Sequence, residues 1–262
     1  MFVQGAFIVA ISILISILIF IFVFGATLSS FVHLVADRIP QHESINGRSH
    51  CPTCNTQLRW MDIIPFFGFF LNKGKCHHCG SKIPIIHPIM EFIGGALFVL
   101  SFHVFGLTLE LIAAWIIILA LISESVSDIN KQIVIDRVWM IGIVPLIIIR
   151  IIQNQFFDYL VSAGVMFILL FLIAFIGSKI MKKDVLGGGD IKLYLFIGFA
   201  LTIEKSFLSL FLASIIALIY SMIKGKDKES YIPLVPFIAV GVIISYFLGS
   251  AIFEFYFSLL GV

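Results

Sequence analysis

Long apolar runs separated by short polar segments dominate this chain. A helix that crosses a bilayer needs about 20 apolar residues, and shorter runs suffice where neighbouring helices cover them. We identify eight such runs, at residues 4–31, 88–105, 109–127, 138–152, 159–181, 191–201, 207–223 and 232–260. The pattern therefore predicts an all-α polytopic membrane protein with about eight transmembrane helices, of which 191–201 is the shortest.

The composition excludes an ordinary soluble domain. Of the 262 residues, 60% are hydrophobic and 12% are charged, whereas soluble domains carry about 25% charged residues. No Lys or Arg precedes the first run, which is too long for the apolar core of a signal peptide, so we expect an uncleaved first span. No basic stripe suggests nucleic acid as a partner.

The basic residues indicate the orientation in the membrane. Four segments, 32–87, 128–137, 178–192 and 224–231, hold 15 of the 17 Lys and Arg residues, and the opposite loops keep only Arg150 and Lys205. Because cytoplasmic loops are enriched in Lys and Arg, we expect these four segments in the cytoplasm and both termini outside.

Segment 32–87 is the one sizeable polar region and contains two Cys-x-x-Cys hooks. The hooks are formed by Cys51 and Cys54 and by Cys76 and Cys79. Four thiolates spaced in this way suit tetrahedral zinc, and Gly80 suits the tight turn that follows such a hook. Disulfides and an iron–sulfur cluster are the alternatives, and cytosolic placement disfavours disulfides. A full four-cysteine shell leaves no position for water, so we expect structural zinc, with His77 and His78 as solvated residues.

Two acids are candidates for chemistry. Asp190 follows Gly187, Gly188 and Gly189 at the cytoplasmic start of the run 191–201, and Asp128 ends the run 109–127 on the same side. Acids at membrane depth are costly and usually functional, and glycines allow close backbone approach. Two neighbouring carboxyls that share one proton can activate water and polarise a carbonyl.

Purely structural roles could also explain the same acids. Asp128 could cap the following helix or pair with Lys131, and Asp190 could be a helix N-cap. Other acids that could take part are Glu91, Glu124, Asp136 and Asp184. A transporter or scaffold that carries protons or ions on these acids, with a structural zinc domain, is the alternative from another class. The metalloprotease pattern His-Glu-x-x-His is absent from the sequence.

The glycine motif together with the cysteine hooks resembles the type IV prepilin peptidase family of bacteria, a group of Gly-x-Gly-Asp aspartyl proteases. The resemblance covers nearly the whole chain. It includes Arg38-Ile39-Pro40, the segment Leu58 to Pro65, Pro88-Ile89-Met90-Glu91, Gly187 to Lys192, and Ile232-Pro233-x-x-Pro236-Phe237. One departure is Ile135, since the family often has Pro directly before the polar residue that here is Asp136.

The resemblance implies a division into a first transmembrane helix (1–31), a cytoplasmic zinc-binding domain (32–87) and a transmembrane peptidase domain (88–262). It implies Asp128 and Asp190 as catalytic residues and Cys51, Cys54, Cys76 and Cys79 as the metal shell. The implied reaction removes the short basic leader from prepilins or pseudopilins at the cytoplasmic face of the bacterial inner membrane. Many members also methylate the new N-terminus with S-adenosylmethionine, and the length suits a competence-type member of Gram-positive bacteria. The substrate, the methyl-donor site and the oligomeric state are not indicated.

Overall fold

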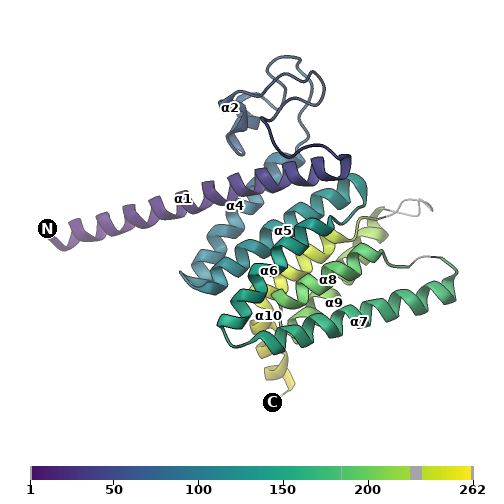
Figure 1. Ribbon diagram of the computed structural model, residues 1–262. Helices are drawn as coiled ribbons and strands as arrows, with labels where there is room; N and C mark the ends of the chain where they lie inside the picture. The colour runs from purple at the N-terminus through teal and green to yellow at the C-terminus, as the bar shows by residue number, and fades with distance from the viewer. Residues whose placement is uncertain (1, 184, 225–231, 261–262) are drawn as a thin grey trace. The chain divides into compact units, whose positions relative to one another are not determined.

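The computed structural model describes residues 2–183, 185–224 and 232–260. Apart from two isolated β-bridges, the regular elements in these ranges are helical (Figure 1). The eight longest are α1 (Phe2–Arg38), α4 (Ile86–Phe105), α5 (Leu109–Lys131), α6 (Asp136–Ile152), α7 (Phe156–Met181), α8 (Gly188–Ala200), α9 (Ile203–Lys224) and α10 (Val235–Leu260). They coincide with the eight predicted apolar runs, so the predicted all-α class is confirmed.

Six of the described helices, α1, α4, α5, α7, α9 and α10, are long and apolar enough to cross a membrane. The chain is therefore a multi-pass membrane protein. The other two runs form shorter helices, since α6 has 17 residues and α8 has 13. The number of helices of full membrane length is thus lower than the predicted eight, although each predicted run is helical.

The short helix α8 is covered by protein. Eight of its 13 residues are buried, and it packs against α6, α7 and α9. At Gly198 an added Cβ would lie 2.2 Å from the Cα of Ala163 on α7, so a side chain there would push the two helices apart. A helix that neighbouring helices enclose does not have to match the thickness of the bilayer. This explains why α8 can be as short as 13 residues.

A buried arginine binds the end of α8. Arg150 is fully buried, and its Nε and Nη2 donate hydrogen bonds of 3.2 and 3.1 Å to the carbonyls of Phe199 and Ala200. The last carbonyls of a helix have no partner within it, so the guanidinium supplies the missing donors. Its Cζ also lies 3.9 Å from the centroid of the Tyr159 ring. Arg150 belongs to the last turn of α6, within the predicted run 138–152, and not to the loop with which the charge count groups it.

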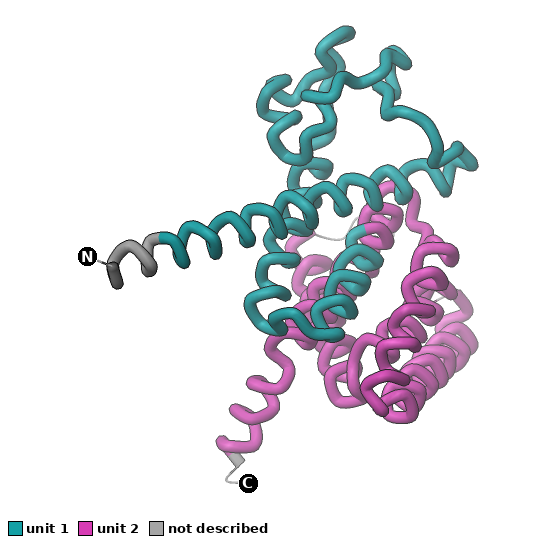
Figure 2. Tube along the Cα trace, turned by 60° about the vertical axis from the view of Figure 1, so that its left-hand side comes forward, with its two compact units in different colours: residues 1–122 teal, residues 123–262 magenta. Residues whose placement is uncertain are grey.

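The chain divides into two compact units, residues 1–122 and 123–262 (Figure 2). Within unit 1, α1 packs along α4, and an added Cβ at Gly95 would lie 2.8 Å from the carbonyl oxygen of Phe22. Small residues allow this close approach of two apolar helices. Within unit 2, α9 packs along α10 and α7 along α8.

The polar loop between α1 and α4 holds three short helical elements, η1 (Ile39–Gln41), α2 (Trp60–Ile63) and α3 (Phe67–Leu71). Two isolated antiparallel bridges, His50 with Gln57 and Lys75 with Lys82, enclose the two cysteine hooks. The predicted boundary at residue 31 differs from the structure, since α1 continues to Arg38. The proposed three-part division of the chain stays a prediction.

Candidate active site and metal centre

Asp128 lies in the last turn of α5 and is 7% exposed. Its Oδ2 accepts a hydrogen bond of 2.9 Å from the backbone N–H of Val235, the first residue of α10. The first N–H groups of a helix lack partners within it, so Asp128 caps α10. A capping role was considered from the sequence, but for the helix that directly follows. The capped helix is instead the last one of the chain.

Asp190 is the third residue of α8, and Gly187 occupies the cap position. The alternative that Asp190 is itself the N-cap is therefore wrong. An acid in the first turn still interacts favourably with the helix dipole. The carboxyl lies against the backbone of Gly187, because an added Cβ there would be 3.0 Å from Asp190 Oδ2.

The glycines before Asp190 differ in their surroundings. An added Cβ at Gly189 would lie 2.8 Å from Cβ and Cγ2 of Val134, whereas one at Gly188 would meet nothing within 4 Å. Gly189 therefore allows the segment that follows Asp128 to approach the start of α8. The carboxyls of Asp128 and Asp190 are close enough for their charges to interact.

An exposed ion pair joins the same two segments. Lys192 Nζ donates a hydrogen bond of 2.9 Å to Asp136 Oδ2, and both side chains are about half exposed. Asp136 lies just before the predicted span 138–152, and the hydrogen bond from Lys192 lowers the pKa of its carboxyl. Because Asp136 is thus held ionised by a cation, it is a poor candidate for sharing a proton. Asp136 is the first residue of α6, so its contact holds α8 beside the start of α6.

Glu124 lies one turn before Asp128 and is fully buried. Its Oε2 accepts a hydrogen bond of 2.7 Å from the backbone N–H of Ile135, whereas Oε1 has no hydrogen-bond partner among the described residues. The departure at Ile135 therefore has a structural consequence, since Pro has no N–H to donate. The contact holds the loop after α5 against the helix.

The remaining candidate acids lie elsewhere. Glu91 belongs to unit 1, where its Oε2 accepts a hydrogen bond of 2.6 Å from the backbone N–H of Phe66. Phe66 has a φ of 62°, so this bond helps to hold a turn of the polar loop. Asp184 and most of the segment 224–231 lie outside the described residues.

The four cysteines converge. Their sulfur atoms all lie within 4.8 Å of one another, with Sγ–Sγ distances of 3.8 Å between Cys51 and Cys79 and 4.0 Å between Cys54 and Cys76. Four thiolates placed tetrahedrally at about 2.3 Å from zinc are about 3.8 Å apart. The donor set and its spacing therefore fit zinc, and the cysteines are free thiols in this structure.

The two hooks have the same backbone geometry. Cys51 N–H donates to Thr56 O at 3.0 Å, and Cys76 N–H donates to Ser81 O at 2.8 Å. The residue after each hook has a positive φ, 55° at Asn55 and 71° at Gly80, so the turn expected at Gly80 is present. The neighbouring Ser81 hydroxyl lowers the pKa of the Cys51 thiol to about 5, which favours the metal-binding thiolate.

The imidazole of His77 pairs with Asp62 and is not one of the converging metal-binding side chains. Its Nδ1 lies 2.9 Å from Oδ2 of Asp62, whose carboxylate also binds Arg59 and Asn72. Burial raises the pKa of Asp62, but the hydrogen bonds from Arg59 and Asn72 prevail and lower it to about 2. This network joins α2 to the second hook.

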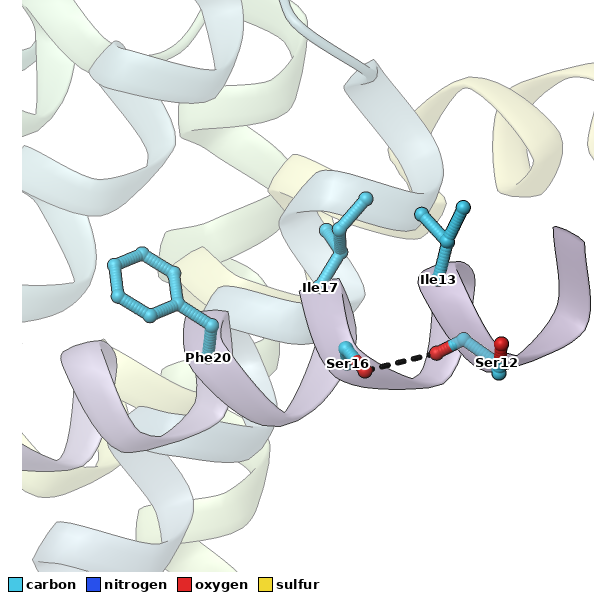
Figure 3. A pocket seen from close by; sticks show the side chains of 5 residues that line it. All are labelled: Ser12, Ile13, Ser16, Ile17 and Phe20. Atoms are coloured by element: carbon cyan, nitrogen blue, oxygen red, sulfur yellow. Dashed lines mark hydrogen bonds between the residues drawn. The ribbon is translucent and has the colours of Figure 1, made fainter. Parts of the chain in front are cut away.

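A shallow pocket lies on the surface of α1 and is lined by Ser12, Ile13, Ser16, Ile17 and Phe20 (Figure 3). All five residues come from one helix, and Ser16 Oγ donates a hydrogen bond of 2.9 Å to the carbonyl of Ser12. The lining holds no acid, base or thiol. This pocket is therefore not a candidate for hydrolysis.

Comparison with known proteins gives two family matches. Residues 23–105 match the Bacterial Peptidase A24 N-terminal domain, and residues 115–222 match the Type IV leader peptidase family. A prepilin leader peptidase/N-methyltransferase of Bacillus subtilis is 34% identical over 242 residues, which cover 90% of this chain and 96% of that protein. A protein with the same name from Vibrio cholerae is 28% identical and covers 84% of this chain and 92% of its own length. No solved structure matches.

Proposed function

Because this chain belongs to the type IV leader peptidase family, we propose that it is a membrane aspartic endopeptidase that removes the short basic leader from prepilins or pseudopilins. The proposed mechanism rests on the placement of Asp128 in the last turn of α5 and of Asp190 in the first turn of α8. These acids come from α5 and α8, and their carboxyls interact electrostatically. Neighbouring carboxyls of this kind share one proton and titrate as a unit.

In the proposed reaction, the ionised carboxyl of the pair takes a proton from water. The water oxygen attacks the carbonyl carbon of the peptide bond, and the protonated carboxyl donates its proton to the carbonyl oxygen. One hydroxyl of the resulting gem-diol returns its proton to the pair as the C–N bond breaks. The leaving nitrogen takes a proton from the pair, so one shared proton remains on the two acids. This is the division of roles that two carboxyls in different surroundings allow.

The carboxyl of Asp128 is held in position for this role. One of its oxygens is fixed by Val235, which limits the rotation of the carboxyl. Asp190 is fixed from the other side by the first turn of α8, whose position depends on Gly189 and on the Asp136–Lys192 ion pair. Preorganised acids lower the cost of reaching the reactive geometry.

We place this site at the cytoplasmic face of the bacterial inner membrane. The concentration of Lys and Arg in the segments next to Asp128 and Asp190 supports that orientation. Prepilins carry a basic leader directly before an apolar helix, so their cleavage site would lie at this depth.

The polar segment 32–87 is proposed as a zinc domain with a structural role. Cys51, Cys54, Cys76 and Cys79 would hold the ion, and four thiolates leave no coordination position for a reacting water. The segment 88–262 would carry the peptidase. The names of the relatives also support N-methylation of the new N-terminus by S-adenosylmethionine.

The test is incubation of the purified chain in detergent with a prepilin, followed by mass spectrometry of the product. We expect cleavage at a single bond before the apolar helix, and a mass increase of one methyl group when S-adenosylmethionine is present. Failure of the folded protein to cleave any prepilin or pseudopilin tested would instead favour an ion-carrying transporter or scaffold. Cleavage without methylation would overturn the second activity alone.

A further inference from the structure

Three side chains with metal-binding atoms gather where the polar loop leaves α1 and returns to α4. His33 and Asp37 lie four residues apart in the last turns of α1, and His87 is the second residue of α4. Residues four apart on a helix share a face. All three belong to unit 1 (Figure 2), and none of them is part of the four-cysteine site.

The geometry of this group suits one ion. Nε2 of His33 lies 3.7 Å from Oδ2 of Asp37, and the rings of His33 and His87 are stacked with centroids 4.0 Å apart. One nitrogen from each imidazole and one carboxylate oxygen all lie within 4.8 Å of one another. Small side-chain rotations would bring these donor atoms to the separations found around a coordinated ion.

His33 carries the strongest indication of a ligand. Its residue exposure is 2%, and neither Nδ1 nor Nε2 has a hydrogen-bond partner within the described ranges 2–183, 185–224 and 232–260. Buried polar atoms are satisfied in the great majority of cases, and an orphaned one calls for a specific explanation such as an ion. The second imidazole and the carboxylate beside it supply the other donors that an ion needs.

We propose that His33, Asp37 and His87 bind a divalent transition-metal ion of the zinc type, at a second site distinct from the four-cysteine centre. Two imidazoles and one carboxylate are donors that suit Zn²⁺ and its neighbours, whereas Mg²⁺ and Ca²⁺ prefer oxygen alone. Three protein ligands leave one position for water or for a further ligand.

The position of this site gives the ion a function. Asp37 is the second-last residue of α1 and His87 is the second residue of α4, so one ion would tie the two ends of the polar loop together at its base. Glu91, one turn further along α4, is already bound to the backbone of Phe66 within the loop. The ion would therefore add to an existing contact between α4 and the loop, and metal supply would control how firmly the loop is held.

The test uses the full chain, purified in detergent without a polyhistidine tag, stripped of metal and titrated with Co²⁺ and with Zn²⁺. We expect two ions per chain in the wild type and one in His33→Asn. His103→Asn is the matched control, since His103 is an exposed histidine in the last turn of α4, and it should still bind two ions. Asp37→Asn, at a partly exposed residue, should weaken the second ion at least tenfold even if His33→Asn folds poorly.

Cobalt spectra separate the two sites. Binding to the cysteines gives a thiolate-to-cobalt charge-transfer band, whereas binding to imidazole and carboxylate gives ligand-field absorption without that band. The variants should lose only the second contribution and should lose the extra thermal stability that the second ion confers on the wild type. One ion in the folded wild type, or two ions in folded His33→Asn and Asp37→Asn, would overturn the proposal.

Discussion

Oδ2 of Asp128 accepts a hydrogen bond from the backbone N–H of Val235, 107 residues later in the chain. The end of α5 is thereby fastened to the beginning of α10 through a proposed catalytic group. The same carboxyl thus has a structural partner and an electrostatic partner, Asp190. A loss of activity at Asp128 has to be separated from a loss of this helix cap, and the first prediction is designed for that purpose.

Replacing Asp128 or Asp190 by Asn should reduce prepilin cleavage by about 10²–10⁴-fold, because the pair loses its shared proton. Asn caps helices about as well as Asp, so Asp128→Asn should keep α10 in place and the protein folded. The measurement is the single-turnover cleavage rate, with thermal unfolding as the check of the fold. Asp158→Asn, at an exposed acid in the first turn of α7, is the control. Full cleavage by either dyad variant would disprove the pairing.

Gly189→Ala should damage the site and Gly188→Ala should not. The new Cβ at position 189 would press on Val134, which overpacks the contact and costs about 1–3 kcal/mol. At position 188 the added methyl meets nothing, so the helix should gain up to about 1 kcal/mol. Cleavage rates and thermal midpoints of both variants are the measurements. Adding Val134→Ala should restore Gly189→Ala, and equal behaviour of the two alanine variants would refute the close approach.

Breaking the Asp136–Lys192 ion pair should slow cleavage mildly without changing its pH dependence. An exposed pair contributes about 0.2–1 kcal/mol. Since the pKa of Asp136 is lowered in the folded protein, its contribution is present above the unfolded value of about 3.9 and is lost only as pH falls through the lower folded value. It is therefore constant between about pH 5 and 8. Asp136→Asn and Lys192→Met, alone and together, should give the same pH profile as the wild type, and an altered profile would mean that Asp136 takes part in proton transfer.

Ile135→Pro should destabilise the protein although the family often has Pro at this position. The variant removes the donor to the fully buried Glu124, and a buried acceptor without a partner costs about 1–3 kcal/mol. Ile135→Val keeps the N–H and nearly the same volume, so it is the matched control. Thermal unfolding in detergent compares the two. If Glu124→Gln causes no further loss of thermal stability in the Ile135→Pro variant, the lost hydrogen bond is the cause of the destabilisation. Equal stability of the Pro and Val variants would contradict this explanation.

Cys51→Ser should remove the ion from the four-cysteine centre and loosen the polar loop. Three thiolates do not complete the tetrahedral shell, and structural zinc contributes directly to folding. Metal content and limited proteolysis between residues 42 and 85 are the measurements, with the exposed His78→Ala as control. A stable variant that lacks this ion and retains full peptidase activity would show that the centre is dispensable.

Sequence reasoning identified the eight helical runs, the family and the peptidase class because each depends on local information. Hydropathy over about 20 residues indicates a span, and the spacing of Cys51, Cys54, Cys76 and Cys79 indicates their convergence. The glycine run before Asp190 indicated a close backbone approach, which Gly189 makes with Val134. The catalytic roles of Asp128 and Asp190 and the competence link stay predictions.

The sequence by itself determined the membrane class, the helices and the residue types available for chemistry. The tertiary structure decided which groups meet, because each partner lies far along the chain. Val235 for Asp128, the α8 carbonyls for Arg150 and His87 for His33 are all partners that no local pattern indicates. The same packing decided that a 13-residue helix can lie among longer ones, since burial by α6, α7 and α9 replaces the length that contact with lipid would require.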